Sequence, residues 1–214
     1  MPRDVQLYDT IGTTYAVMRR TEPRIAAQVW AALGDARTVL NVGAGTGSYE
    51  PPDRDVTAVE PSAVMRAQRP EGAAPCVAAS AESLPFADRS FDLVTAGYGL
   101  RNVPRLEPAI AEIRRVLRPG GRLLSLDFNR PSNPLVRGVY LGYLTIAGSA
   151  LGWALHRDPD TYRYIPESIK RYPGAHGVAA MLEHAGFTEC RVVPLLGGLM
   201  AINTGRIPAS GANH

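Results

Sequence analysis

The chain has 214 residues, of which 45% are hydrophobic and 20% charged, and its formal net charge is +3. These values exclude a disordered segment and suit one α/β domain with a sizeable buried core. The charges are dispersed, so the mild basicity gives no reason to expect nucleic acid as a partner. Cys76 and Cys190 lack metal-type spacing and no apolar run follows Met1, which favours reduced thiols and a cytoplasmic location.

One segment competes with a soluble interpretation. From Gly138 to Leu155 no residue is charged, and this length reaches the lower limit for a membrane span. Glycines, tyrosines, Thr145 and Ser149 dilute the hydrophobicity of the segment, and its flanks belong to an α/β pattern. We therefore expect a helix of the domain rather than a transmembrane helix.

Apolar periodicity and turn residues predict alternating helices and strands. A helix is expected after its N-cap Thr21, with an apolar stripe of Ile25, Val29 and Leu33 and a stop at Gly34. The following elements are then predicted: strands at 38–42, 56–59, 76–79, 91–95 and 122–128, a short helix at 62–67, and an amphipathic helix at 107–117 ended by a tight turn at 118–121. After Pro134 the pattern becomes an apolar, aromatic, helical insertion. A helix at 177–185 and two closing strands, 190–193 and 199–204, complete the chain.

Strands that alternate with helices imply a parallel sheet with right-handed crossovers. We predict a doubly wound α/β fold with seven strands, six parallel and the last antiparallel. Its expected divisions are an N-terminal helical segment (1–37), a Rossmann-like domain (38–206) with a helical cap at about 134–170, and a tail (207–214).

The strongest local signal is a strand that runs into Gly43-Ala44-Gly45-Thr46-Gly47, followed by a second strand that ends at Glu60 and Pro61. Glycines let the backbone approach a ligand at the carboxyl end of the first strand. A carboxylate after the second strand can accept both hydroxyls of a ribose. An ordinary glycine turn is the alternative interpretation.

A dinucleotide site is the sharper rival, because Gly43-x-Gly45 also begins that fingerprint. Gly47 comes one position too early for it, and a helix-rich stretch precedes the first strand. Pro51-Pro52 also interrupts the segment before Glu60, which leaves only a stub of the helix that would hold a pyrophosphate. S-adenosylmethionine (SAM) carries no phosphate and needs no such helix, so SAM is the predicted cofactor, with no metal.

The loop Ser80-Ala81-Glu82-Ser83-Leu84-Pro85-Phe86 follows the third predicted strand. In such a sheet this loop lies beside the adenine pocket, where Ser80 or Glu82 could bond the purine edge. The alternative is a structural loop that Leu84 and Phe86 anchor in the core.

Over about residues 80–206 the chain resembles the ubiquinone/menaquinone biosynthesis C-methyltransferases. The motifs that carry the resemblance are Ala81-Glu-x-Leu-Pro-Phe, Phe91-Asp, Gly99-Leu-Arg-Asn-Val103, Arg115-Val-Leu-x-Pro-Gly-Gly-Arg122, Asp127-Phe-x-x-Pro131, Tyr162-x-Tyr-x-x-x-Ser-Ile169 and Ala185-Gly-Phe. The first half departs more from the family. Tyr8-Asp9 and Tyr15 resemble its N-terminal helix, but Ala16 replaces a second Asp, and Asn41 stands where many members have Asp.

The resemblance implies a class I SAM-dependent methyltransferase that methylates a carbon of a prenylated hydroquinone. The cofactor contacts that it implies are Thr46, Glu60, Ser80, Ala81 and Gly97, and we add Tyr15 to them. In the reaction, Arg101 would stabilise the oxyanion of the substrate and Asn102 would orient it. Arg101 is not assigned as a base, because a guanidinium stays protonated.

Two other functions stay open: an O-, N- or C-methyltransferase of secondary metabolism, and a non-catalytic SAM-binding protein. The partner expected under the first interpretation is a lipophilic quinol, whose tail the apolar stretch from Leu135 to Leu155 would receive. That stretch could also touch a bilayer transiently, because cations flank it: Arg137, Arg157, Arg163, Lys170 and Arg171. His156 and His176 are expected to be structural or exposed rather than catalytic, and a homodimer is the expected oligomer.

Overall fold

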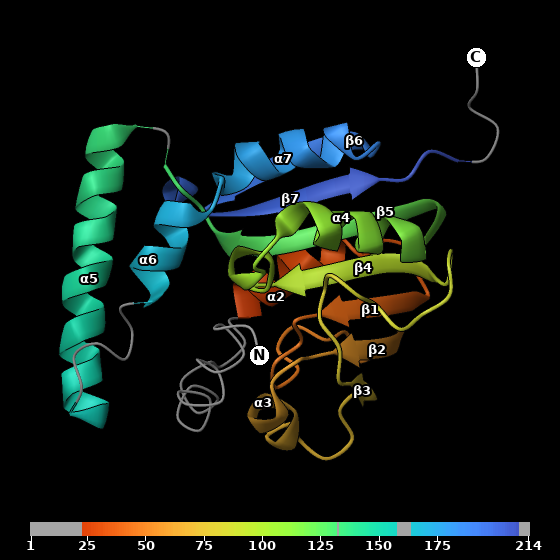
Figure 1. Ribbon diagram of the computed structural model, residues 1–214, viewed down its shortest axis with the longest axis horizontal. Helices are drawn as coiled ribbons and strands as arrows, with labels where there is room; N and C mark the ends of the chain where they lie inside the picture. Colours follow the sequence, from red (N-terminus) through yellow and green to blue (C-terminus); the bar gives the residue numbers. More distant parts are fainter. Residues whose placement is uncertain (1–22, 132, 158–163, 210–214) are drawn as a thin grey trace.

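A computed structural model describes residues 23–131, 133–157 and 164–209. Its centre is one seven-stranded sheet in the order β3-β2-β1-β4-β5-β7-β6 (Figure 1). The strands are β1 (Thr38–Val42), β2 (Asp55–Val59), β3 (Cys76–Val77), β4 (Phe91–Gly97), β5 (Leu117–Phe128), β6 (Thr188–Leu195) and β7 (Met200–Arg206). The first five pair in parallel, whereas β7 is antiparallel to both β5 and β6. The predicted arrangement, with six parallel strands and the last antiparallel, is confirmed.

Helices cover both faces of the sheet. The helices are α2 (Pro23–Ala31), α3 (Ala63–Ala67), α4 (Leu106–Val116), α5 (Pro134–His156), α6 (Tyr164–Arg171) and α7 (Gly174–His184), with short 3-10 turns η1 (Leu100–Asn102) and η2 (Leu196–Gly198). In Figure 1, α4 and α7 lie in front of the sheet and α2 lies behind it. The fold is therefore doubly wound, as predicted.

Side-chain alternation along the strands builds a separate core on each face. Val39, Leu93 and Leu124 pack with Val29 of α2 and with Leu33 in the turn after it. Their immediate neighbours in the strands point the other way and pack with α4 and α7: Leu40, Val94 and Leu123 with Ile110, Ile113, Val178 and Leu182. Because successive residues of a strand face opposite sides, a strand buried on both faces needs a continuous apolar run. The runs 38–42 and 91–95 have this pattern, which is why they could be recognised.

Several predicted elements differ in extent, among them β3, β5 and α7. β3 is a two-residue strand, because β2 ends at Val59 and the last backbone bond between the two strands runs from the Glu60 amide to the Val77 carbonyl, 3.1 Å. The predicted turn at 118–121 is an irregular part of β5, whose pairing with β4 shifts register between Phe91 and Leu93. α7 begins at Gly174, ahead of the predicted Gly177.

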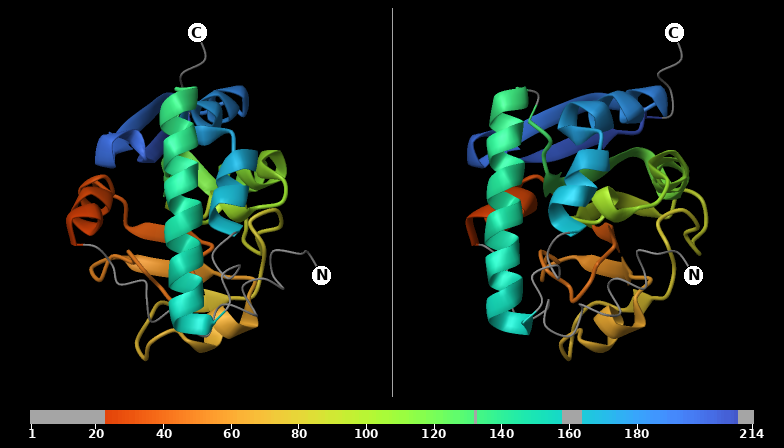
Figure 2. Two further views of the ribbon diagram at one scale, coloured as in Figure 1. Left: turned by 90° about the vertical axis from the view of Figure 1, so that its left-hand side faces the viewer. Right: turned by 60° about the vertical axis from the view of Figure 1, so that its left-hand side comes forward.

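The helical insertion after Pro134 is confirmed and forms a cap at one end of the sheet. α5 crosses the carboxyl ends of the parallel strands, with α6 between it and the sheet (Figures 1 and 2). The side chain of Asn133 caps α5 by accepting a bond from the Leu135 amide, 2.9 Å, and the Tyr140 hydroxyl donates to the Leu199 carbonyl, 3.2 Å. No helix in the described ranges is long and apolar enough to cross a membrane.

Candidate functional site

The two loops that meet at the centre of the sheet follow β1 and β4. The strand order reverses between these neighbours, and in doubly wound sheets ligands bind at this switch point. Gly43, just after β1, has a φ of +68°, and a Cβ on Gly99 would lie 3.0 Å from the Val42 carbonyl oxygen. The two backbones touch here, so the contact excludes a side chain at Gly99 and favours glycine at Gly43.

Glu60 closes the glycine loop from the neighbouring strand. Its Oε2 accepts a hydrogen bond from the Gly45 amide and its Oε1 from the Ser62 amide, each at 2.9 Å. Burial raises the pKa of this carboxyl, and the two amides and the cations of Arg66 and Arg69 act against that rise. A carboxylate has about four lone-pair positions, so Glu60 keeps capacity to accept further donors.

A largely buried ion pair lies next to the same loop. Arg69 meets the carboxylate of Glu50 at 2.9 Å, and its Nη1 donates to the Gly45 carbonyl at 3.3 Å. The Asn41 amide donates to Glu50 at 3.0 Å. A Cβ on Gly47 would lie 3.1 Å from Glu50 Oε2, and the φ of Gly47 is +97°, so this position favours glycine. Residues 43–54, all of which the structure describes, contain no helix, in agreement with the short segment expected before Glu60.

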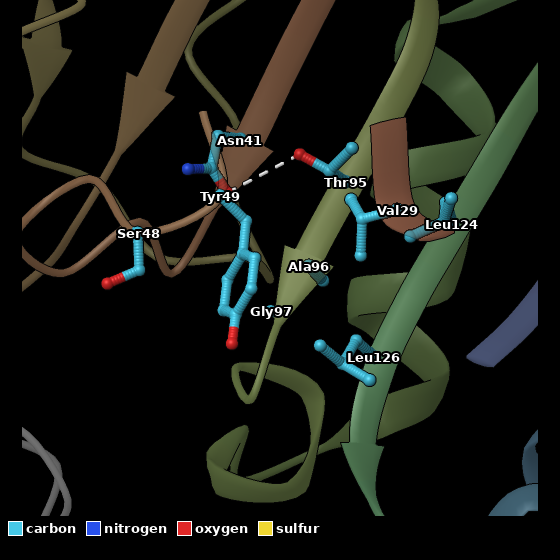
Figure 3. Close-up of a pocket in the computed structure, with 9 residues that line it drawn as sticks. All are labelled: Val29, Asn41, Ser48, Tyr49, Thr95, Ala96, Gly97, Leu124 and Leu126. Carbon is cyan, nitrogen blue, oxygen red and sulfur yellow. Dashed lines mark hydrogen bonds between the residues drawn. The ribbon is translucent and has the colours of Figure 1, made fainter. Parts of the chain in front are cut away.

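A small pocket opens beside the glycine loop, on the side of the sheet that α2 covers. Figure 3 shows it between β1, β4 and β5, with the Tyr49 ring at its mouth and Gly97 beneath the ring. Its lining residues are Val29, Asn41, Ser48, Tyr49, Thr95, Ala96, Gly97, Leu124 and Leu126. Trp30 fixes the wall, because its indole N–H donates to the Tyr49 carbonyl at 3.1 Å.

The loop predicted to line an adenine pocket is held by residues of α4. Arg115 donates to the carbonyls of Leu84 and Phe86 at 2.9 and 2.8 Å, and Glu112 accepts from the Leu84 amide at 2.8 Å. Leu84 is buried, and Phe86 packs edge-on against Phe91. Leu84 and Phe86 therefore anchor the loop in the core. That Ser80, Ala81 and Glu82 contact the ligand stays a prediction. Ser80 bridges to Ser83, Ala81 is buried, and Glu82 pairs with Arg105 at 3.0 Å.

Arg101 lies in η1, which follows the glycine contact after β4, and its side chain is fully buried. Its Nε donates to Asp127 Oδ1 at 3.1 Å, and its backbone amide donates to Asp127 Oδ2 at 3.0 Å. Its Nη1 donates to the Ser168 hydroxyl of α6. Burial raises the pKa of Asp127, and the adjacent guanidinium counteracts this. The half-buried Asn102 donates to the Tyr98 carbonyl at 3.0 Å.

The structure thus brings Gly43, Ala44, Gly45, Thr46 and Gly47 together with Glu60 and Gly97 at one end of the sheet. Pro61 lies next to Glu60 and is exposed. Tyr15 lies outside the described residues, as do Tyr8, Asp9, Ala16, Thr21, Tyr162 and Arg163. Sequence reasoning assigned no role to Glu50, Arg69, Asp127 or Ser168. The last two belong to motifs of the family resemblance.

These residues fit a cofactor with a ribose and a charged amino-acid end. The left-handed glycines leave a backbone cradle, Glu60 is a buried acceptor beside it, and Gly97 leaves room under Tyr49. Residues 65–206 match the ubiE/COQ5 methyltransferase family. SAM is the cofactor that this family and this fold imply.

Individual proteins agree with the family match. A ubiquinone/menaquinone biosynthesis C-methyltransferase from Hahella chejuensis is 44% identical over 129 residues, which are 60% of this chain and 52% of that protein. The protein of the same name from Methylobacterium nodulans is 34% identical over 94% of this chain and 88% of its own length.

Among solved structures, a SAM-dependent methyltransferase from Thermotoga maritima superposes with a TM-score of 0.73 at 20% identity. It covers 95% of this chain and 99% of its own, so it shares the fold. The family match, together with the Methylobacterium relative, shows that the chain belongs to the ubiE/COQ5 methyltransferase family.

Proposed function

We propose that this protein transfers a methyl group to a ring carbon of a prenylated hydroquinone. The observation that carries the proposal is its membership of a family whose named members are quinone-biosynthesis C-methyltransferases. The chain spans about half the length of the first of these relatives in the matched region, 52%, so its activity and substrate are part of the proposal.

The cofactor would lie across the carboxyl ends of β1, β2 and β4. Residues proposed to hold it are Tyr15, Gly43, Ala44, Gly45, Thr46, Gly47, Glu60, Pro61, Ser80, Ala81, Glu82 and Gly97. SAM, when bound, supplies a methyl group that is already electrophilic. Glu60 would accept the ribose hydroxyls, and the loop from Ser80 to Glu82 would border the purine. The glycine loop would let the backbone approach the ligand closely.

Arg101 and Asn102 are the proposed catalytic residues. A ring carbon becomes nucleophilic as the neighbouring hydroxyl loses its proton, so the protein must align the ring and stabilise an oxyanion. Arg101 supports this role because it lies in η1, just after β4, at the same end of the sheet as the glycine loop. Its partner Asp127 keeps it fixed in place, and Asn102 lies beside it in η1.

Mass spectrometry of reactions with SAM and a panel of quinols tests the proposal. Methyl gain on a ring carbon is the expected result. Gain on oxygen or nitrogen would favour a different small-molecule methyltransferase, and SAM binding without gain would favour a non-catalytic protein. Arg101→Lys serves as the internal control. It keeps the charge that Asp127 needs, so it should leave SAM affinity unchanged and slow methyl transfer by about 100-fold.

We also propose that the cap touches the bilayer surface reversibly. One side of α5 exposes apolar side chains at helical spacing, with Leu135 76% and Ile146 74% exposed. The others on this side are Val139, Tyr143 and Trp153. The flanking cations Arg137, Arg157, Lys170 and Arg171 suit anionic lipid, since each contributes about 1 kcal/mol near such a surface.

Sedimentation with vesicles that contain phosphatidylserine tests the membrane proposal. Binding should be present at low salt and lost at high salt. Ile146→Asp should abolish binding, whereas Thr145→Asp, exposed on another side of the same helix, should retain most of it. Binding that ignores Ile146→Asp would refute a role of this face. The homodimer remains a separate prediction, for which analytical ultracentrifugation is the test. A dimer that Ile146→Asp dissociates would assign the face to a second copy.

A further inference from the structure

We infer that Asp127 and Ser168 are positioning residues for Arg101, and that Ser168 couples the orientation of this arginine to the docking of the cap helix α6. The inference rests on the proposed function, because it concerns how the proposed catalytic arginine is held. It adds two residues and a coupling between the cap and the chemistry.

Asp127 fixes Arg101 at two points. The carboxylate at the end of β5 accepts from the Arg101 backbone amide through Oδ2 and from the Arg101 Nε through Oδ1, at 3.0 and 3.1 Å. Oδ1 also accepts from the Phe128 amide at 2.8 Å, which orients the carboxylate itself. One buried carboxylate that binds both the backbone and the side chain of the same residue fixes the backbone and the guanidinium together.

Phe128 adds a third constraint from the same strand. The Arg101 Cζ lies 5.2 Å from the centroid of the Phe128 ring, within the range of a cation–π contact. The ring of Tyr98 lies next to that of Phe128, with 5.4 Å between the ring centroids. The ring of Tyr49, which lines the pocket beside the glycine loop, lies 6.4 Å from that of Tyr98. The arginine therefore stands at one end of a row of rings that reaches the pocket shown in Figure 3.

Ser168 links Arg101 to the cap. The Ser168 hydroxyl donates to the Ile165 carbonyl at 2.8 Å, so its lone pairs are available to accept from Arg101 Nη1. The neighbouring Ile169 is fully buried, and Ile165 packs against Met65 of α3. A Cβ on Gly45 would lie 3.2 Å from Met65 Cε, so α6 spans the distance between the arginine and the glycine loop.

The consequence is that Arg101 takes its bound orientation only when α6 is docked against the sheet. α6 also contacts α5, the helix proposed to receive the prenyl tail. A tail that binds at α5 would favour the docked cap and hence the productive arginine. Binding energy from a remote part of a substrate then appears in kcat as well as in KM.

The test compares hydroquinones that carry long and short prenyl tails. With the wild-type protein, kcat should rise with tail length. Ser168→Ala should lower kcat for the long-tailed substrate by about tenfold, comparable to other losses of positioning, and should flatten the dependence on tail length. Ser168→Thr keeps the hydroxyl and should restore both. Glu167→Gln, a change at an exposed position of the same helix, is the matched control and should change neither.

Asp127→Asn and Asp127→Ala test the other anchor. The asparagine variant keeps one oxygen acceptor, so kcat should fall in the order wild type, Asp127→Asn, Asp127→Ala, while SAM affinity measured by calorimetry stays constant. Unaltered tail dependence in Ser168→Ala, or SAM affinity that falls in parallel with kcat in the Asp127 variants, would overturn the inference.

Hydrogen exchange of residues 164–171 provides a readout that needs no turnover. Ser168→Ala should speed exchange in α6 and in η1 together, with the global unfolding midpoint unchanged, whereas Glu167→Gln should leave exchange in both elements as it is in the wild type. If the wild type methylates no hydroquinone, the proposed function fails. The exchange result still decides whether Ser168 couples the two elements, and equal exchange in wild type and Ser168→Ala would refute that coupling.

Discussion

Glu60 holds a buried negative charge between two backbone amides, and this arrangement makes its contribution to cofactor binding measurable. Glu60→Ala should weaken SAM binding by about 1.5–3 kcal/mol, the usual value of charge-assisted hydrogen bonds. Calorimetry measures the affinity, and Glu82→Ala tests the second proposed carboxylate contact, on the purine side, in the same way. Unchanged affinity in Glu60→Ala would remove this residue from the site.

The same carboxyl predicts a pH dependence. Burial raises the pKa of Glu60 above the ordinary value of 4.5. The ribose hydroxyls need the ionised form as acceptor, so SAM affinity should fall as the pH is lowered from neutrality toward 4.5. Glu60→Gln cannot titrate and should bind weakly with a flat profile. An equally sloped profile in this variant would assign the titration to another group.

The neighbouring carboxylate of Glu50 favours an uncharged donor such as Asn at position 41. Its amide donates to Glu50 at 3.0 Å, so Asn41→Asp would place two carboxylates in contact. The variant should lose about 1–2 kcal/mol of stability at neutral pH, because the shared Arg69 cannot fully compensate both charges. One carboxyl of the pair would have a raised pKa, so the loss should shrink as the pH falls through that pKa. Urea unfolding at pH 7 and pH 5 measures it, and a variant as stable as the wild type would refute the argument.

Among the elements, the amino-terminal ends of β1 and β4 are joined by Asp92. Its carboxylate accepts from the amides of Arg37 and Thr38, at 3.1 and 3.0 Å, and from Arg118. Burial raises the pKa of Asp92, but the bonds from Thr38, Arg118 and Arg37 outweigh burial and hold it at about 2. The Phe91-Asp92 motif is therefore part of the scaffold, at the opposite end of β4 from Gly97.

Asp92→Asn should destabilise the fold by about 1–2 kcal/mol at neutral pH. A carboxyl with a depressed pKa stabilises the folded state above its unfolded pKa, and this contribution disappears as the pH falls through the folded pKa. The difference between wild type and variant should therefore be full above pH 3.8 and should shrink toward pH 2. Denaturant midpoints at pH 6 and pH 3 check this, and a constant difference would contradict it.

An element can be predicted from the sequence when the residues that it contacts are close to it along the chain, and not when they are far away. The strands around Val39 and Leu93 were recognisable from local apolar runs, and the glycine loop and Glu60 from their places directly after strands. The pairing of Arg101 with Asp127 and Ser168 was not, because these residues are 26 and 67 positions away. Nothing in local periodicity encodes such a contact. The irregular stretch at 118–121 resembled a turn for the same reason, since its bonds run to Ile207, far along the chain.

Among the described residues, the two larger cores lie on opposite faces of the sheet, and the cap lies outside both. Leu93→Ala and Leu123→Ala empty opposite faces, and each should cost about 2–5 kcal/mol. Leu135→Ala, on the exposed side of α5, should stay within about 0.5 kcal/mol of the wild type. Urea unfolding followed by circular dichroism measures all three. A large cost at Leu135 would mean that α5 packs more closely than its exposure indicates.

The hydrogen bond between Trp30 and the Tyr49 carbonyl has an optical consequence. The chain holds two tryptophans, and one lies against the wall of the glycine-loop pocket while Trp153 is 68% exposed on the cap. In Trp153→Phe the remaining indole emission should respond to SAM, and in Trp30→Phe it should respond to vesicles instead. Each event thus has its own intrinsic fluorophore, so stopped-flow mixing can time cofactor binding and cap contact separately without attaching a dye.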